Sequence, residues 1–197
     1  MSETALDFRG RDALLAVVEQ ACSQPDGESL THTLRDGLCH LIKSKAVSLP
    51  DCVFEPVEGH YARRELYACP VRGTTIVAMT WAPDQGTPIH DHCGLWCVEG
   101  VWQGQLEITR YELEEEDGDR FRFTRYETLT AGTGSAGSLL PPHEYHTIRN
   151  PSKDRIAISL HVYQKAMGTC ATFTPIEGDW YLRGSKTLCL DQIPCDE

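Results

Sequence analysis

Two histidines separated by a single residue lie in the part of the sequence best suited to chemistry. His90 and His92 occur in "GTPIHDHCGLWCVEGVWQG", residues 86–104, and Cys97 follows close behind them. In an extended strand, residues i and i+2 project from the same face. Two imidazoles on one face can bind one metal ion, since histidine is the commonest metal ligand. The pair alone also fits two polar residues on a solvent-facing strand.

Other polar residues occur at strand spacing nearer the C-terminus. His146 lies in "EYHTIRN", which ends at Asn150. In "RIAISLHVYQ", alternation places aliphatic side chains on one face and Ser159, His161 and Tyr163 on the other. Burial of such a row is costly unless its members have hydrogen-bond partners. The row therefore either faces solvent on an ordinary strand or lines the polar interior of a barrel.

The elements that must position these residues change in kind along the chain. Up to about residue 50 the sequence predicts helices with two apolar stripes, formed by Leu14, Leu15, Val18 and Cys22 and by Leu34, Leu38, Leu41 and Ile42. From about residue 60 to 195, short β-branched and aromatic segments alternate with clusters of Gly, Pro and Asp, which is typical of a sandwich or small barrel. We predict one mostly β domain spanning residues 1–197, with N-terminal helices.

Composition excludes several classes of function. The 197 residues include 18 Lys and Arg against 29 Asp and Glu, and the net charge of −11 argues against nucleic acid or an anionic membrane as a partner. We expect a cytoplasmic protein, since no apolar run reaches the roughly 20 residues of a membrane span and the N-terminus lacks a signal-peptide pattern. The nine cysteines include no CxxC pair, so we expect reduced thiols, without a zinc ribbon.

The motif that begins with His90 and His92 resembles the first motif of the cupin superfamily. Within that superfamily it most closely resembles the thiol dioxygenases, and among these the cysteine dioxygenases. The cupin motif has two histidines one residue apart, then a glutamate, then a glycine. Here His90 and His92 are followed by Cys97 at the glutamate position and by Gly104. A cysteine at that position is typical of the cysteine dioxygenases.

The resemblance extends from about residue 61 to 170. His146 and Asn150 match the second cupin motif. The remaining matches are Tyr61-x-Arg63, Ser159-x-His161-x-Tyr163 and Cys170. Their joint occurrence, in order and at the family spacing, is far more specific than the histidine pair alone. It implies a cupin-type small β-barrel, or jelly roll.

The resemblance also implies a metal and a reaction. His90, His92 and His146 would hold one Fe(II), and both atoms of O2 would be added to the sulfur of L-cysteine to give cysteine sulfinate. Three neutral ligands leave the centre at +2, which favours an anionic thiolate. The implied partners are a small-molecule thiol and O2, with no obligatory protein partner.

The substrate carboxylate would bind Arg63, because a guanidinium is planar and permanently charged, and Tyr61 would support that arginine. Tyr163 would place its hydroxyl near the substrate. His161 and Ser159 would form a hydrogen-bonded row behind that hydroxyl.

A thioether cross-link occurs in the resembled family, between a cysteine and a tyrosine. The matching residues here are Cys97 and Tyr163. A buried cysteine without such a bond is the simpler interpretation of Cys97.

Three alternatives stay open. A 3-mercaptopropionate dioxygenase typically has glutamine in place of Arg63 and glycine in place of Cys97, so these two residues favour the cysteine enzyme. A non-catalytic cupin could bind a metal as a sensor or storage protein. A third alternative uses Glu99 as a carboxylate ligand, because it shares a strand face with Cys97, although it lies two residues beyond the usual spacing.

Overall fold

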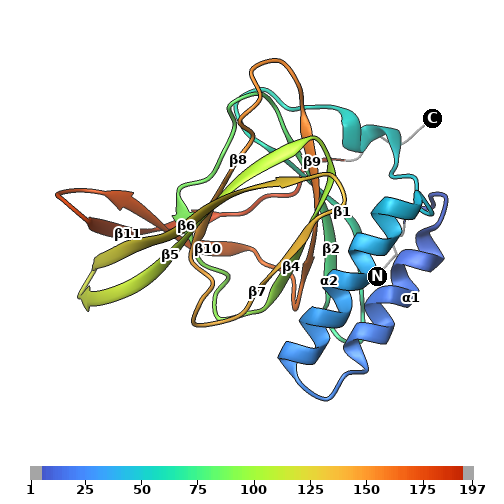
Figure 1. Cartoon of the computed structure of the whole chain (residues 1–197), viewed down its shortest axis with the longest axis horizontal. Helices are drawn as coiled ribbons and strands as arrows, with labels where there is room; N and C mark the ends of the chain where they lie inside the picture. The colour runs from blue at the N-terminus through green and yellow to red at the C-terminus, as the bar shows by residue number, and fades with distance from the viewer. Residues whose placement is uncertain (1–5, 193–197) are drawn as a thin grey trace.

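The computed structural model describes residues 6–192, and its helices precede its strands (Figure 1). The helices are α1 (Arg11–Cys22), α2 (Gly27–Ser44) and a short 3-10 helix, η1 (Asp51–Phe54). The strands are β1 (Ala62–Ala68), β2 (Thr75–Trp81), β3 (Ile89–His90), β4 (Cys97–Gln103), β5 (Gln105–Asp117), β6 (Arg120–Gly132), β7 (Ala136–Leu139), β8 (His146–Arg149), β9 (Ala157–Tyr163), β10 (Thr169–Pro175) and β11 (Trp180–Thr187).

The strands form two antiparallel sheets. One sheet has the order β1-β2-β9-β4-β7, and the other closes on itself in the order β10-β11-β6-β5-β8-β3. The long β5–β6 hairpin projects to the left in Figure 1, away from the helices. The prediction of a mostly β, cupin-type small barrel with N-terminal helices is confirmed.

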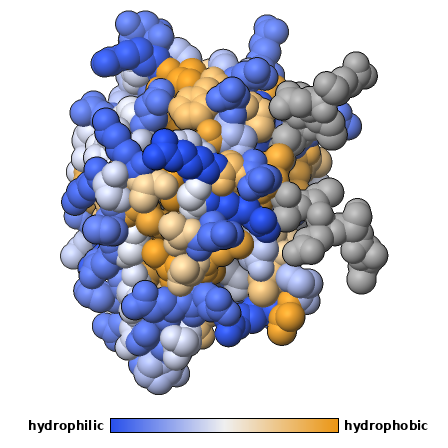
Figure 2. All heavy atoms as spheres, turned by 90° about the vertical axis from the view of Figure 1, so that its right-hand side faces the viewer, coloured by the Kyte–Doolittle hydropathy of each residue, from blue (hydrophilic) through white to orange (hydrophobic). Residues whose placement is uncertain are grey.

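The two helices cover the outer face of the five-stranded sheet (Figure 1). Helix α2 begins after Asp26, whose carboxylate accepts a hydrogen bond from the Ser29 amide at 2.8 Å. The predicted α2 stripe, formed by Leu34, Leu38, Leu41 and Ile42, is buried against the sheet. The side of the molecule that carries the helices is mostly hydrophilic, with small groups of apolar side chains between the polar ones (Figure 2). The helices are therefore amphipathic, as their periodicity predicts.

Strand β9 is buried on both faces, which decides between the two interpretations of its polar row. Ile158, Leu160 and Val162 pack with the helices, while Tyr163 packs inside the barrel among Cys97, Val101 and Trp81. Ser159 and His161 are also buried, each 1% exposed. The row lines the barrel interior and does not face solvent.

One local expectation is wrong. His90 and His92 do not share a strand, because β3 ends at His90. The chain then turns through Cys93 and Gly94, which have positive φ angles of 55° and 71°. No helix in the described part of the chain is long and apolar enough to cross a bilayer.

Candidate metal centre

Three histidines from separate segments meet inside the barrel. His90 ends β3, His92 follows it in the turn, and His146 begins β8 directly opposite His90. The ring centroids lie 4.5 Å apart for His90 and His146, 5.2 Å for His92 and His146, and 5.3 Å for His90 and His92. One nitrogen from each ring lies within 4.8 Å of the other two. The structure thus brings together the three residues that the sequence predicts as ligands.

Backbone carbonyls set the proton positions on two of these rings. Nδ1 of His90 lies 3.2 Å from the Pro88 carbonyl, and Nδ1 of His146 lies 2.8 Å from the Glu144 carbonyl. Because a carbonyl only accepts hydrogen bonds, we assign the ring proton to Nδ1, which leaves a lone pair on Nε2. Nε2 of His146 is buried and has no hydrogen-bond partner among the described residues. A metal ion would satisfy this nitrogen, so the residues fit a metal.

Burial holds two of the rings neutral. It lowers the pKa of His90 to about 3, with the charge of His146 adding to the effect. It also lowers the pKa of His92 well below the usual range, again assisted by His146. A neutral imidazole is the form that binds a cation, so both rings are ready to coordinate.

The polar row of β9 forms a connected chain of hydrogen bonds. The Trp81 indole donates to Oγ of Ser159 at 2.8 Å, and this Oγ lies 2.7 Å from Nε2 of His161. Oε1 of Glu99, which only accepts, lies 3.1 Å from Nδ1 of His161, so we assign the ring proton to Nδ1. The Ser159 hydroxyl then donates to Nε2. Nδ1 of His161 lies 3.5 Å from the Tyr163 hydroxyl. Burial raises the pKa of Tyr163 well above its usual range, so the phenol keeps its proton.

Cys97 and Tyr163 are cross-strand neighbours. They are paired in the register of β4 and β9, and both are buried. Burial raises the pKa of the Cys97 thiol well above its usual range, with the charge of Glu99 adding to the effect. The pair that the sequence predicts for a cross-link is therefore adjacent in the fold.

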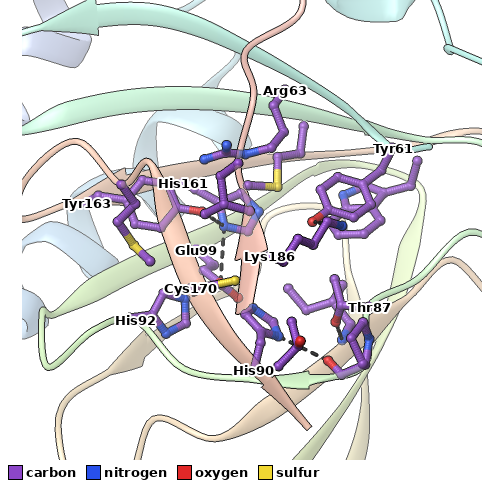
Figure 3. A pocket seen from close by; sticks show the side chains of 17 residues that line it. Tyr61, Arg63, Thr87, His90, His92, Glu99, His161, Tyr163, Cys170 and Lys186 are labelled. Atoms are coloured by element: carbon purple, nitrogen blue, oxygen red, sulfur yellow. Dashed lines mark hydrogen bonds and ion pairs between the residues drawn. The ribbon is translucent and has the colours of Figure 1, made fainter. Parts of the chain in front are cut away.

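A cavity inside the barrel is lined by His90 and His92, and Arg63 is a buried cation at its wall (Figure 3). Arg63 lies on β1 and is only 5% exposed. Nη1 donates a long hydrogen bond of 3.4 Å to the Cys189 carbonyl, while Nε has no partner within residues 6–192. Buried guanidinium groups normally have acceptors for most of their N–H groups. Arg63 thus presents unused donors to an anion.

Tyr61 lines this cavity together with Arg63, and the support that Tyr61 is expected to give Arg63 stays a prediction. Its ring stacks on Trp81 with centroids 4.5 Å apart, and its hydroxyl accepts a hydrogen bond of 3.3 Å from Lys186. Lys186 reaches the cavity from β11, where it pairs with Cys170 of β10. Lys186 was not predicted as a site residue, because this long-range pairing leaves no local motif in the sequence.

The cavity itself is small. It measures about 30 Å3 and is lined by most of the predicted site residues, Tyr61, Arg63, His90, His92, His161 and Tyr163, with Glu99 and Cys170 among the others. His146, Ser159 and Cys97 lie outside this lining, although the distances above connect them to it. The space holds about one water molecule, so a larger ligand must displace its rim.

Glu99 lies closer to the histidines than its position in the sequence indicates. Oε1 is 3.1 Å from Nδ1 of His161, 3.5 Å from Nε2 of His146 and 3.9 Å from Nε2 of His92. Burial acts to raise the pKa of Glu99, but His161 and His146 outweigh it and hold the pKa well below the usual range. The same contact raises the pKa of His146 against the effect of its burial.

Comparison with known proteins gives one family. The family model for cysteine dioxygenase type I matches residues 59–175. Rat (Rattus norvegicus) cysteine dioxygenase type 1 is 24% identical over 98 residues, which are 50% of this chain and 48% of the rat protein. The zebrafish (Danio rerio) protein is 27% identical over 103 residues, with the same shares. The chain thus aligns with about half the length of these curated relatives.

Solved structures resemble the barrel at lower identity. An RmlC-like cupin protein from Desulfovibrio desulfuricans is 17% identical and has a TM-score of 0.40. The match covers 55% of this chain and 86% of that one.

Proposed function

Because the chain belongs to the cysteine dioxygenase type I family, we propose that it is an iron-dependent thiol dioxygenase that converts L-cysteine and O2 into cysteine sulfinate. One observation carries the choice of substrate class. A buried guanidinium with unused donors lines the same cavity as His90 and His92. A metal-binding end and a carboxylate-binding end within one cavity suit a small molecule that has both a thiol and a carboxylate.

Fe(II) would be held by His90, His92 and His146. Bound there, Fe(II) would supply Lewis-acid chemistry that lowers the pKa of a thiol and redox chemistry toward O2. The protein supplies three imidazoles, two of them oriented by hydrogen bonds to the Pro88 and Glu144 carbonyls.

Arg63 would bind and orient the substrate carboxylate. The chain carries a net charge of −11, so an anionic substrate depends on a local cation. The planar guanidinium can donate two parallel hydrogen bonds to a carboxylate, which fixes the direction of the substrate as well as its position. Orientation of this kind contributes to rate as well as to affinity.

Tyr163 would donate a hydrogen bond to the substrate. Its raised pKa keeps the phenol protonated, and the His161 ring holds the hydroxyl from behind at 3.5 Å. Ser159 and Trp81 in turn fix the His161 ring. These residues position the phenol and keep its proton directed into the cavity.

The proposed reaction is tested on protein loaded anaerobically with Fe(II) and then exposed to O2 with L-cysteine, 3-mercaptopropionate or cysteamine. We expect oxygen uptake with L-cysteine to be fastest and to match sulfinate formation mole for mole, as measured with an oxygen electrode and by mass spectrometry. A preference for 3-mercaptopropionate would overturn the choice of substrate. Firm binding of zinc with no turnover of any thiol would favour a sensor or storage protein.

A second expected result concerns the proposed thioether between Cys97 and Tyr163, which face each other across β4 and β9. After turnover with iron and O2, part of the denatured protein should be about 2 Da lighter than the sequence mass, because the bond forms with loss of two hydrogens. Cys97→Ser should abolish the lighter species, whereas Cys93→Ser, which changes an exposed thiol, should not. A lighter species that persists in Cys97→Ser would assign the modification to another residue.

A further inference from the structure

A second and larger cavity lies between the two sheets, at the opposite edge of the five-stranded sheet from the cavity of the histidine centre (His90, His92 and His146). The cavity of the histidine centre is bordered by β1 and β2 at one edge of that sheet. The second cavity is bordered by β7 at the other edge, and by β5 and β6 of the facing sheet. It measures about 430 Å3, against about 30 Å3 for the first. Cavities of this size hold small-molecule ligands, and the proposed function assigns this one no role.

One layer of side chains separates the two cavities. Glu99, Ile148 and His161 line both of them, and Figure 3 shows Glu99 and His161 from the side of the smaller cavity. Ile148 lies two residues after His146 on β8, so both side chains project from the same face of the strand. Ile148 packs inside the barrel, where it is 2% exposed. The second cavity therefore reaches to within one aliphatic side chain of the histidine centre.

The second cavity is open because β7 carries a glycine where a side chain would fill it. Gly137 pairs with Glu99 in the register of β4 and β7, and directly paired residues project to the same side of a sheet. A Cβ atom at Gly137 would meet no heavy atom of the described residues within 4 Å, its chain neighbours apart. The φ angle of Gly137 is not in the left-handed region, so the backbone does not require glycine either. The effect of this glycine is to leave space beside Glu99.

The lining of the second cavity suits a small neutral molecule better than an ion. Nη1 of Arg110 lines it but lies 3.0 Å from Oε1 of Glu127. Arg35 lines it as well, and its Nη2 lies 3.3 Å from Oδ1 of Asp36. Both cations are thus already paired, and the charged Glu99 carboxylate at the inner end would repel an anion. The remaining walls are mainly aliphatic, with contributions from Val101, Leu106, Ile108, Leu129, Leu139 and Ile148.

The small size of the first cavity creates a need for another entrance. It holds about one water molecule, so a thiol bound between Arg63 and the histidines would fill it and close that side. O2 that reacts with the bound thiol must then arrive from a different direction. O2 is small and nonpolar, and aliphatic cavities bind such molecules, as they bind xenon.

We propose that the second cavity is a binding site and entry route for O2, which passes Ile148 to reach the histidine centre while the thiol occupies the first cavity. This inference rests on the proposed function, because it assigns the path of one of the two substrates. Ile148 is the aliphatic part of the shared wall, so the passage is placed there and not beside Glu99. The two substrates then enter from opposite edges of one sheet and do not compete for a single opening.

The first experiment detects O2 in the metal-free protein. Dissolved O2 is paramagnetic and speeds the relaxation of nearby nuclei, so methyl relaxation rates are measured by NMR under several bar of O2, with argon as the reference. We expect the methyl groups of Leu106, Leu139 and Ile148 to show an O2 effect severalfold larger than those of Leu14, which is buried beneath the helices. An O2 effect no larger in the cavity than at Leu14 would overturn the proposal.

Filling the cavity from Gly137 tests whether the bound O2 occupies this space. Gly137→Val and Gly137→Leu add side chains of increasing size beside Glu99. The control Thr124→Leu adds an apolar side chain at an exposed position of β6 that lines neither cavity. We expect the O2 effect at Leu106 and Ile148 to fall in the order of side-chain size and to stay unchanged in the control. Circular dichroism checks that each variant keeps the fold.

Turnover then separates an entry route from a cavity that only binds gas. In the Fe(II)-loaded protein, kcat/KM for O2 should fall roughly tenfold in Gly137→Leu, while the dissociation constant of L-cysteine, measured anaerobically, stays within about twofold of the wild type. Thr124→Leu should match the wild type in both. An unchanged kcat/KM for O2 in a Gly137→Leu protein whose cavity no longer admits O2 would overturn the route. Absence of thiol turnover in a wild type that shows the O2 effect would instead refute the dioxygenase, and with it the route, while the O2-binding cavity remains.

Discussion

Replacement of His146 by alanine is expected to weaken metal binding roughly 10²- to 10³-fold and to abolish turnover. Structural zinc sites of about 10–16 kcal/mol with four ligands gain about 2.5–4 kcal/mol per ligand, which corresponds to a loss of this size. His146 is fully buried, its Nδ1 is fixed by the Glu144 carbonyl, and its Nε2 has no protein hydrogen bond in the described chain. Metal content after dialysis and a Co(II) dissociation constant measure the loss.

The matched control is His143→Ala. His143 lies three residues earlier on an exposed turn, and it does not line the cavity of the histidine centre. We expect this variant to keep its metal and its activity. Loss of metal in His143→Ala together with retention in His146→Ala would show that the ligand set is wrong. Near-UV circular dichroism of both metal-free variants separates loss of a ligand from loss of the fold.

Arg63→Ala is expected to reduce kcat/KM for L-cysteine by roughly 10²-fold, because removal of one partner of a buried ion pair leaves the other desolvated and unpaired. The Arg63 guanidinium is buried and has few acceptors of its own, so the substrate carboxylate would be its main anionic partner. The kcat/KM of Arg63→Lys should fall between those of the wild type and Arg63→Ala, since lysine keeps the charge but lacks the paired donors.

Cysteamine provides the control, because it has the thiol and amine of cysteine without the carboxylate. It should be a poor substrate of the wild type and lose little more in Arg63→Ala. The measurement is kcat/KM for L-cysteine, 3-mercaptopropionate and cysteamine on each protein. Equal losses for all three thiols would show that Arg63 supports the fold and does not bind the carboxylate.

The periodicity of apolar residues predicted the buried faces of helices and strands well where one local pattern determines burial. The apolar stripe of α2 and the alternation of β9 both correspond to faces that the structure buries. Alternation could not decide what covers the polar face of β9. That depends on closure of the second sheet, in which β3 pairs with β10 some 80 residues away in the sequence.

The site was predicted less completely, because its geometry depends on turns and on register between distant strands. His92 lies beyond the end of β3, just before the turn at Cys93 and Gly94, so strand alternation does not place it in the cluster. Glu99 approaches His161 because β4 and β9 pair in a particular register, which spacing from His92 does not reveal. Lys186 arrives on β11 and donates a hydrogen bond to the Tyr61 hydroxyl, a long-range contact that no local motif in the sequence indicates.

The burial of every residue from Ala157 to Tyr163 constrains how this protein can evolve. On most strands one face is free to accumulate neutral substitutions, and variation there can later alter function. On β9 one face supports the helices and the other carries Ser159, His161 and Tyr163, so no position is neutral. New specificity must therefore arise from the cavity rim, where Lys186 is exposed and Met167 is half-buried, while β9 stays nearly fixed across descendants.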